Sequence, residues 1–593
     1  MTVRTLPDLV FHVAAHSAGR ADLLAIKRQG QIETWSTERF VRSIHALALA
    51  LEARGFRKGQ RVALFAENCP EWFVAEFACQ LLGLLTVPIY PTLPSGQVEG
   101  ILRDSGARAV FFSDTAKHKL LQDVQAALGE PLALLSIEPG ESAGTPLATL
   151  LAEGQERATA QPLDALRGRV EEQDVASLIY TSGTTGEPKG VMLTHRNFIS
   201  NMLAAGEVFK MGPEDLALSF LPLSHVFERT CDHLFFYRGV AVHYVPAIER
   251  VPGALPEVKP TVLPSVPRLY ERAYLKVLAN QQKESPFKRR VFDWALGVGK
   301  RATERSESGR RRGAWLTAER ALAQRMVYGK LQDRFGGRLR LPISGGAPLA
   351  REIGVFFAAL GVPLYQGYGL TETAPVLTVN HPEAVRQGSV GRPLPQVEIR
   401  IADDGEILAK SPGVMRGYWQ KPEATAEVFD ADGWFHTGDI GYLDADGFLY
   451  ITDRKKDLLV TSGGKNVAPQ PIEKALLASG VLAQAVVVGD GFPQITALLV
   501  PNVETLGVEL GERDPALLAR DPRAEKRVQQ AVDAVNKGLA EHERVRRFRL
   551  LERELTLADG ELTPTLKVRR KVVLERYRDV VSSMYLKTQK IET

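Results

Sequence analysis

Residues 180–191 read Tyr180-Thr181-Ser182-Gly183-Thr184-Thr185-Gly186-Glu187-Pro188-Lys189-Gly190-Val191 and follow an apolar run at residues 175–179. The glycines let this backbone bend and approach a ligand closely, the hydroxyls offer hydrogen-bond donors, and Lys189 adds a compact positive charge. Together these properties predict a phosphate-binding loop. Gly190 follows Lys189 where a Walker A loop has Ser or Thr, so a P-loop NTPase is disfavoured. The alternative is a flexible Thr/Gly turn without function.

The length and the composition indicate a soluble globular protein with more than one domain. The chain has 593 residues, of which 45% are hydrophobic and 24% charged, and its net charge is +4. This length exceeds what one hydrophobic core usually supports, so at least two domains are expected. The small net charge argues against a nucleic-acid partner.

The cysteines and the N-terminal residues indicate a cytoplasmic protein. Cys69, Cys79 and Cys231 have apolar or aromatic neighbours and no metal-ligand spacing, so they are interpreted as reduced core residues. Residues 1–19 lack the apolar core of a signal peptide, and the longest apolar stretch, residues 77–90, is interrupted by Gln, Gly and Pro. Neither export nor membrane spanning is expected.

Helices and short apolar strands alternate ahead of the loop, which predicts a parallel sheet. The predicted helices cover residues 36–54, 71–82 and 95–104, and the predicted strands cover residues 61–65, 85–88 and 109–112. Residues 113–172 mix Gly, Pro and Glu with short apolar runs and are expected to form a peripheral elaboration.

A strand is predicted to begin at Leu216, and His225 lies at its end. A lone histidine is more often a hydrogen-bonded structural residue than a catalytic one. Glu228 is interpreted as a structural partner of Arg229 or Arg268.

Basic residues outnumber acidic ones between residues 287 and 312, and a few aromatic residues lie among them. Three uses are open for this segment: a solvated helical face, a patch for an anionic lipid surface, or a patch for the phosphates of coenzyme A (CoA). The basic residues are Lys288, Arg289, Arg290, Lys300, Arg301, Arg305, Arg310, Arg311 and Arg312.

Two further stretches suit a nucleotide. The turn Gly345-Gly346-Ala347, after a strand predicted at residues 338–342, permits close backbone approach to a flat ligand. Residues 368–372 place the aromatic ring of Tyr368, the hydroxyl of Thr371 and the carboxylate of Glu372 within one short segment that also contains Gly369. A polar strand end with ordinary turn chemistry is the alternative.

These stretches resemble, in order and in type, the adenylate-forming superfamily of acyl-CoA synthetases, beetle luciferases and nonribosomal adenylation domains. The segments around His225 and around residues 261–272 are similar to the long-chain acyl-CoA synthetases in particular. The resemblance implies a large multi-subdomain N-terminal α/β domain with βα-type sheets, at residues 1–454. A small mobile α+β domain would follow at residues 455–593.

The resemblance also implies roles for single residues. The loop would close over the β- and γ-phosphates of ATP, Tyr368 would stack on adenine, and Thr371 would donate to the α-phosphate. Glu372 would support Mg²⁺, and His225 would lie beside the acyl carboxylate. The implied phosphate-loop residues are Thr181, Ser182, Gly183, Thr184, Thr185, Gly186 and Lys189.

Further along the chain, Asp439 ends the stretch Trp434-Phe435-His436-Thr437-Gly438-Asp439 and is its single carboxylate. It is suited to accept hydrogen bonds from both ribose hydroxyls. By resemblance, Arg454 makes a second ribose or phosphate contact, and Lys456 is the pivot between the domains. Residues Gly463, Gly464 and Lys465 would line the pantetheine tunnel of CoA.

The candidate catalytic lysine lies in Gly560-Glu561-Leu562-Thr563-Pro564-Thr565-Leu566-Lys567-Val568-Arg569-Arg570-Lys571. This stretch departs from the superfamily's common Pro-Lys-Thr-x-Ser-Gly-Lys pattern. Alignment on the final lysine makes Lys567 the bridge between the carboxylate and the α-phosphate. Lys571 is a weaker candidate for the catalytic lysine. The alternative without function is a solvated basic strand.

The sequence thus predicts an AMP-forming long-chain fatty acid–CoA ligase that uses ATP, Mg²⁺ and CoA. Two alternatives are an adenylating enzyme with another acid or acceptor, such as a carrier protein, and a non-catalytic nucleotide-binding scaffold. Peripheral contact with the membrane through residues 288–312 is a further expectation, and no nucleic-acid partner is expected.

Overall fold

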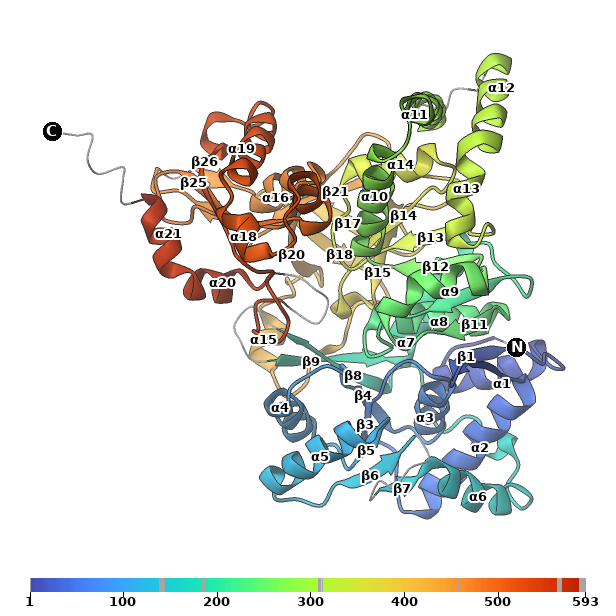
Figure 1. Ribbon diagram of the computed structural model, residues 1–593. Coiled ribbons are helices and arrows are strands. Elements are labelled where there is room, and N and C mark those ends of the chain that lie inside the picture. Colours follow the sequence, from blue (N-terminus) through green and yellow to red (C-terminus); the bar gives the residue numbers. More distant parts are fainter. Residues whose placement is uncertain are drawn as a thin grey trace.

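The computed structural model describes residues 2–137, 144–182, 188–307, 311, 313–455, 458–463, 465–562 and 568–585. The protein is of mixed α/β class, as predicted. Two large sheets with their helices form most of the molecule, and the residues after the four-stranded sheet form a smaller unit beside them (Figure 1).

An eight-stranded sheet contains the phosphate-loop segment. In spatial order its strands are β19 (Gly417–Tyr418), β9 (Pro188–Thr194), β8 (Val175–Ser182), β4 (Leu85–Pro88), β3 (Arg61–Phe65), β5 (Ala109–Phe112), β6 (Ala133–Ser136) and β7 (Thr145–Pro146). The predicted parallel pairing of β4, β3 and β5 is confirmed. Strands β4 and β5 are buried along their whole length, as expected for a parallel sheet covered on both faces.

The helices between these strands match the predictions closely: α2 (Thr37–Ala53), α3 (Pro70–Leu81) and α4 (Ser95–Ser105). The Ser36 hydroxyl caps α2 by accepting from the backbone N–H of Arg39. Every residue of α3 is buried. The apolar stretch at residues 77–90 is therefore part of the core, where a helix is covered on all sides.

The prediction of a peripheral elaboration at residues 113–172 is wrong in one respect. Strands β6 and β7 from this segment extend the eight-stranded sheet, and α6 (Leu147–Ala158) packs against α2. The two helices touch at Gly154, where an added Cβ would lie 1.7 Å from the carbonyl oxygen of Ala46. Only glycine permits such a close crossing.

A nine-stranded sheet forms the second large layer. In spatial order its strands are β16 (Arg392–Pro393), β15 (Val376–Val379), β14 (Tyr365–Gly369), β13 (Leu341–Ser344), β12 (Val262–Ser265), β10 (Leu216–Ser219), β11 (Ala241–Tyr244), β1 (Leu24–Arg28) and β2 (Gln31–Trp35). Strand β13 starts and ends later than the predicted residues 338–342. Its helices include α7 (His195–Val208), α8 (Val226–Arg238), α10 (Pro267–Gln282) and α14 (Arg351–Ala359).

A buried ion pair joins the helices of the two sheets. Arg229 on α8 pairs with Glu76 on α3, and both side chains are 0% exposed. The Arg229 guanidinium also donates to Ser177 Oγ and Thr86 Oγ1, each at 2.9 Å. The prediction for Glu228 is therefore wrong, because Arg229 has another partner and Arg268 lies 3.7 Å from Glu554.

The rest of the chain forms two smaller sheets. The strands β17 (Glu398–Ile401), β18 (Glu406–Lys410), β20 (Phe435–Leu443) and β21 (Leu449–Arg454) make one antiparallel sheet, and β24 (Leu482–Val488), β25 (Ile495–Pro501) and β26 (Val545–Leu550) make the other. Helices α16 (Pro469–Ala478) and α19 (Pro522–Asn536) cover the second sheet and share a separate apolar core with it. This is the compact α+β unit predicted from the sequence.

The basic segment falls mainly on α11 (Pro286–Glu307), which packs against α14 and α12 (Ala314–Ala323). Within the part of the chain that the structure describes, no helix combines the length and the apolarity needed to cross a bilayer.

Candidate active site

The described residues of the predicted phosphate loop belong to two paired antiparallel strands, β8 and β9. Thr181 pairs with Lys189, and Ser182 pairs with Pro188. Gly183, Thr184, Thr185 and Gly186 lie outside the described residues. The hydroxyl of Tyr180 donates to Asp104 Oδ2 at 2.5 Å, which ties the part of β8 nearest the loop to α4.

A short strand connects this hairpin to Glu372. Strand β19 pairs with β9, so that Tyr418 lies opposite Val191. The Tyr418 hydroxyl donates to Glu372 Oε1 at 3.0 Å, and the Lys189 ammonium lies 5.0 Å from the centre of the Tyr418 ring. Burial raises the pKa of the Glu372 carboxyl. Tyr418 therefore orients the carboxyl group of Glu372, the predicted Mg²⁺ ligand, and contacts Lys189, a predicted phosphate-binding residue.

Sequence reasoning missed Tyr418. The aromatic residues in Gly417-Tyr418-Trp419 are the only local signal, and they suit a core strand equally well. The partner carboxylate is 46 residues away in the chain, so the contact depends on the pairing of β19 with β9.

We expect Tyr418→Phe to lower the rate of ATP–pyrophosphate exchange about tenfold, because a hydrogen bond to a charged group contributes about 1.5–3 kcal/mol. The Mg²⁺ concentration for half-maximal exchange should also rise, since the Glu372 carboxylate loses its orientation. Tyr442→Phe, on a half-exposed tyrosine of β20, is the matched control. An unchanged Mg²⁺ dependence in Tyr418→Phe would argue against this role.

The predicted adenine and ribose ligands meet in one cluster around the buried carboxylate of Asp439. Asp439 on β20 lies opposite Arg454 on β21. Its Oδ2 accepts from the Tyr368 hydroxyl at 2.7 Å, and its Oδ1 lies 3.2 Å from Arg454 Nε. Each carboxylate oxygen keeps a second acceptor site, so Asp439 can still receive hydroxyl donors. The structure thus brings together three residues that the sequence spreads over residues 368–454.

The segment that carries Tyr368, Thr371 and Glu372 is tightly fitted. An added Cβ at Gly369 would lie 1.7 Å from the carbonyl oxygen of Pro375, so glycine is required there. The strand register shifts between Tyr368 and Gly369, and the chain then enters the short helix η5 (Thr371–Thr373). Thr371 and Glu372 are partly exposed at this end of β14.

Gly345 in the turn Gly345–Ala347 and His225 both lie next to Phe227. A Cβ added at Gly345 would lie 3.1 Å from the Phe227 ring, and Gly346 has a φ of +75° that favours glycine. His225 caps α8, with its Nδ1 accepting from the Phe227 N–H at 3.1 Å. The neutral imidazole therefore carries its proton on Nε2, which makes that nitrogen a donor.

Two buried carboxyl groups follow His225 on α8. Glu228 accepts from the backbone N–H of Phe220, and Asp232 accepts from the Ser219 hydroxyl. Both side chains are fully buried, and burial raises the pKa of each well above its usual range. Burial therefore favours the protonated form of each group in the folded protein.

Glu228→Gln should stabilise the protein, and the gain should grow as the pH rises above 4.5, the ordinary pKa of glutamate, by up to about 1.4 kcal/mol per pH unit. The unfolded protein ionises this carboxyl group at a lower pH than the folded protein does, so the wild type loses stability as the pH rises through this window. Glutamine removes that loss. Melting temperatures across this pH range, with exposed Glu99→Gln as the control, measure it. A constant difference from the wild type would contradict the prediction.

The predicted pivot and CoA-binding residues lie within or next to segments that the structure does not describe. Lys456, Gly464 and Lys567 lie outside the described residues. Gly463 is exposed in a turn, and the backbone N–H of Lys465 donates to Thr461 Oγ1 at 3.1 Å. Next to the pivot, the Lys455 ammonium pairs with Asp404 at 2.6 Å and with Glu406 at 2.8 Å.

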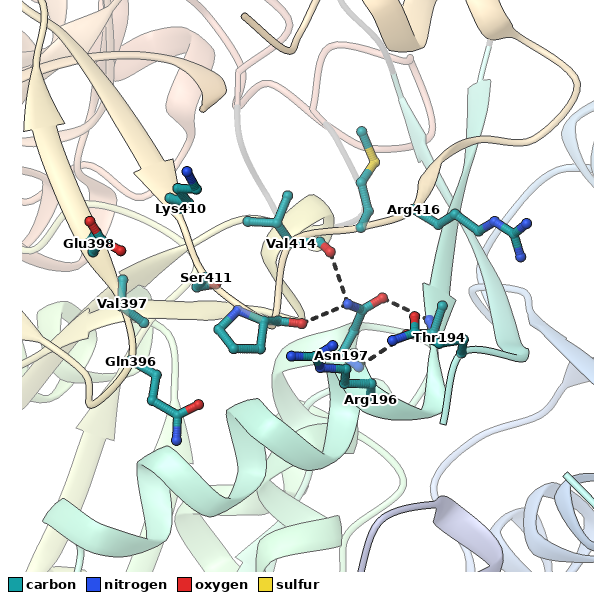
Figure 2. A pocket seen from close by; sticks show the side chains of 13 residues that line it. Thr194, Arg196, Asn197, Gln396, Val397, Glu398, Lys410, Ser411, Val414 and Arg416 are labelled. Atoms are coloured by element: carbon teal, nitrogen blue, oxygen red, sulfur yellow. Dashed lines mark hydrogen bonds between the residues drawn. The ribbon is translucent and has the colours of Figure 1, made fainter. Parts of the chain in front are cut away.

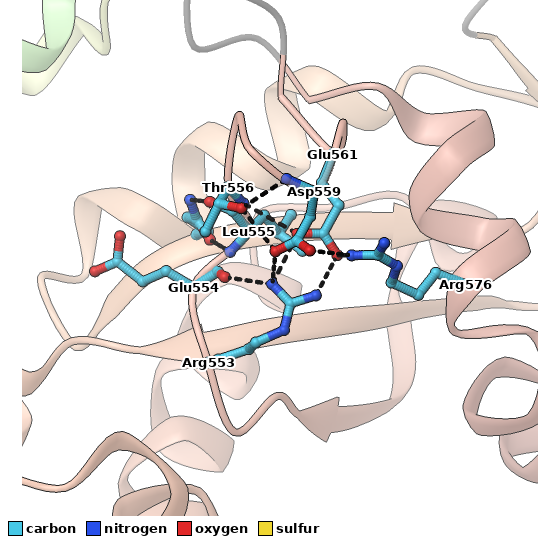
Figure 3. A network of polar contacts seen from close by, with 8 residues as sticks. Arg553, Glu554, Leu555, Thr556, Asp559, Glu561 and Arg576 are labelled. Atoms are coloured by element: carbon cyan, nitrogen blue, oxygen red, sulfur yellow. Dashed lines mark hydrogen bonds and ion pairs between the residues drawn. The ribbon is translucent and has the colours of Figure 1, made fainter. Parts of the chain in front are cut away.

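An acidic residue holds both ends of the segment that contains Lys567. Glu561 is fully buried and pairs with Arg553 at 2.7 Å and Arg576 at 3.0 Å (Figure 3). Burial alone would raise the pKa of Glu561, but these partners lower it. After the segment, the N–H of Arg569 donates to the Glu561 carbonyl at 2.7 Å, and Leu562 forms a bridge with Val568. The two ends are therefore fixed at one point.

A cavity of about 1030 Å³ lies elsewhere, between the start of α7 and the segment from β17 to β19 (Figure 2). Asn197, at the start of α7, donates to the carbonyl oxygens of Pro412 and Val414 beside it. None of the predicted site residues lines this cavity. The candidate site therefore consists of the clusters around Asp439 and Glu372 and does not include this cavity.

Comparison with known proteins identifies the family. The AMP-binding enzyme family matches residues 13–419, and the family's C-terminal domain matches residues 456–589. This chain is a member of the AMP-binding enzyme family. The AMP-binding enzyme is 38% identical to the long-chain-fatty-acid–CoA ligase FadD15 of Mycobacterium bovis, covering 92% of this chain and 91% of the relative. It is 30% identical to human long-chain-fatty-acid–CoA ligase 1, covering 95% of this chain and 84% of the relative.

Solved structures share the fold of this AMP-binding enzyme. ATP-bound MatB from Rhodopseudomonas palustris matches with a TM-score of 0.72 at 24% identity, covering 97% of this chain and 99% of that chain. The adenylation domain of a carboxylate reductase from Mycobacterium chelonae matches with a TM-score of 0.79 at 22% identity, covering 98% and 91%. The predicted superfamily and fold, with a large N-terminal and a smaller C-terminal domain, are confirmed.

Proposed function

We propose that this protein is an AMP-forming long-chain fatty acid–CoA ligase. The observation that carries the proposal is the contact of Asp439 with both Tyr368 and Arg454, which brings together three residues suited to bind a nucleotide in a chain of this family. Relatives that cover nearly all of the chain are named long-chain-fatty-acid–CoA ligases, which supports the acid and the acceptor.

In the first step, the fatty carboxylate attacks the α-phosphorus of ATP, and pyrophosphate leaves with the electrons of the broken P–O bond. Both reactants are anionic, so the residues must position them and offset their repulsion. Tyr368 and Asp439 would hold the adenosine, and Lys189 with Thr181 would hold the outgoing phosphates. His225 would donate from Nε2 to the acyl carboxylate, and Lys567 would bridge that carboxylate and the α-phosphate.

The residues fit a Mg²⁺ that is held mostly by substrate oxygens. No three His, Cys, Asp or Glu side chains in the described residues are grouped to hold a metal ion. Mg²⁺ commonly takes only one or two protein carboxylates and completes its shell with phosphate oxygens and water. Glu372, oriented by Tyr418, is the carboxylate we assign to it. The ion would neutralise charge on the phosphates.

In the second step, the sulfur of the CoA thiol attacks the acyl carbonyl and loses its proton to solvent. A C–S bond forms, the acyl C–O bond breaks, and AMP leaves. We propose that residues 455–593 rotate about Lys456 between the steps, which withdraws Lys567 and brings Gly463, Gly464 and Lys465 to the acyl adenylate. The ion pairs of Lys455 with Asp404 and Glu406 join the first residue of the small domain to the large domain, directly beside the proposed pivot.

Acid-dependent ATP–pyrophosphate exchange, followed by CoA-dependent AMP release over a series of chain lengths, tests the proposal. We expect exchange with long-chain acids and release of AMP only when CoA is added. Exchange without turnover of CoA would identify another acceptor, such as a carrier protein. No exchange with any acid would favour a nucleotide-binding scaffold. Either result would overturn the proposed function.

A further inference from the structure

Helix α12 and the short helix η3 (Gln324–Tyr328) that continues it expose a stripe of large apolar side chains. Trp315 is 79% exposed, Leu322 is 52% exposed, and Met326 is 41% exposed. Their spacing places them along one face of the helix, with exposed Ala318 between them. Figure 1 shows this helix at the outer end of the molecule, beyond the sheets.

The opposite face of this helix holds it to the protein. Leu316 packs with Val298 and Ala302 of α11, and the hydroxyl of buried Tyr328 donates to the carbonyl of Ala295 at 2.6 Å. Glu319 pairs with Arg301 of α11 at 2.7 Å. The exposed stripe therefore contributes little to folding, and its apolar character calls for another explanation.

Basic side chains flank the stripe. Arg311, Arg325 and Lys330 are exposed on or beside the same helix, and Lys300 and Arg305 are exposed on neighbouring α11. A helix with Trp, Leu and Met on one face and Lys and Arg beside it suits the interface of an anionic bilayer, where apolar groups enter the acyl boundary and cations meet headgroups. The same cations would repel a second copy of this face.

We propose that the outer face of α12 and η3, defined by Trp315, Leu322 and Met326, seats on an anionic lipid surface. This differs from the sequence prediction, which placed the contact on the basic residues 288–312. Those residues are carried mainly on α11, whereas the apolar groups lie on the next helix. The purpose of the contact rests on the proposed function, because a bilayer is where a long-chain acid is concentrated.

Sedimentation with vesicles tests the contact in the full-length protein, without ATP or CoA. Vesicles of phosphatidylcholine with an equal amount of phosphatidylglycerol should bind the protein, and pure phosphatidylcholine should bind it far more weakly. Trp315→Ser/Leu322→Ser/Met326→Ser should reduce binding to the mixed vesicles about tenfold or more. Arg325→Gln/Lys330→Gln should reduce it too and flatten its dependence on salt.

The matched control is Val508→Ser/Leu517→Ser, which removes two equally exposed apolar residues from the C-terminal unit. It should bind vesicles as the wild type does. Trp315→Phe should keep most of the binding but lose most of the blue shift that vesicles cause in tryptophan fluorescence. Unchanged melting temperatures would show that the substitutions leave the fold intact.

The proposal is overturned if the triple variant and the control bind equally. It is also overturned if the wild type self-associates and the triple substitution makes it monomeric, since the face would then join two copies. These outcomes are independent of ligase activity. If activity is present, the triple variant should turn over a short water-soluble acid normally and a vesicle-embedded acid more slowly.

Discussion

Replacing Arg229 with methionine should lower the free energy of unfolding by about 3–5 kcal/mol, which is the usual cost of removing one partner of a buried ion pair. The carboxylate of Glu76 would remain fully buried without its guanidinium, and the hydroxyls of Ser177 and Thr86 would lose a donor. His233 lies 3.5 Å from Glu76, but burial lowers the pKa of this imidazole and so resists its protonation. Denaturant-induced unfolding measures the change.

Two further variants separate the buried charge from a simple loss of contacts. Arg229→Met/Glu76→Leu should be more stable than Arg229→Met alone, because no unpaired charge is left inside. Arg103→Met removes an exposed ion pair with Glu99 and should change stability by less than about 1 kcal/mol. If Arg229→Met unfolded like this surface variant, the buried pair would not have the structural role assigned to it.

Lys567→Ala should reduce the rate of acyl-adenylate formation by about a hundredfold to a thousandfold, the usual effect of removing one group that stabilises developing charge. The second step should be largely spared, because Lys567 would be withdrawn before CoA attacks. Pyrophosphate exchange reports the first step, and acyl-CoA formation from supplied acyl adenylate reports the second. Equal loss of both steps would refute the assignment.

Lys571→Ala is the control for this experiment. Lys571 is exposed on the helix α20 (Arg570–Arg576) and is the second lysine that the motif offers. We expect this variant to keep both half-reactions. A selective loss of adenylation in Lys571→Ala, with normal activity in Lys567→Ala, would move the catalytic role to Lys571.

Much of the large domain could be predicted from local patterns. The segment from residue 61 to residue 112 alternates short apolar runs with longer mixed stretches, so the sequence predicts its elements to within a residue or two. Tyr368, Glu372 and Asp439 were chosen as site residues because of their chemistry. The contact of Tyr368 with Asp439 and that of Glu372 with Tyr418 are seen in the structure, whereas the roles of these residues toward ATP stay predictions.

The contacts that join distant parts of the chain could not be predicted. Glu76 and Arg229 are 153 residues apart, and each alone resembles an ordinary surface charge in the sequence. Tyr418 finds Glu372 only because β19 pairs with β9. The exposed stripe on α12 was missed for a related reason, since the sequence of an amphipathic helix does not state which of its faces the fold will cover.

The anchoring of both ends of the Lys567 segment at Glu561 has a consequence for how this sequence can vary. The anchors lie at Glu561, Leu562, Val568 and Arg569, so substitutions between them leave these contacts in place. This arrangement is compatible with a segment, predicted to be catalytic, that departs from the superfamily's common pattern. It also offers an engineering site: residues 563–566 should tolerate exchange with the corresponding segment of a relative, provided that Glu561 and its two arginines are kept.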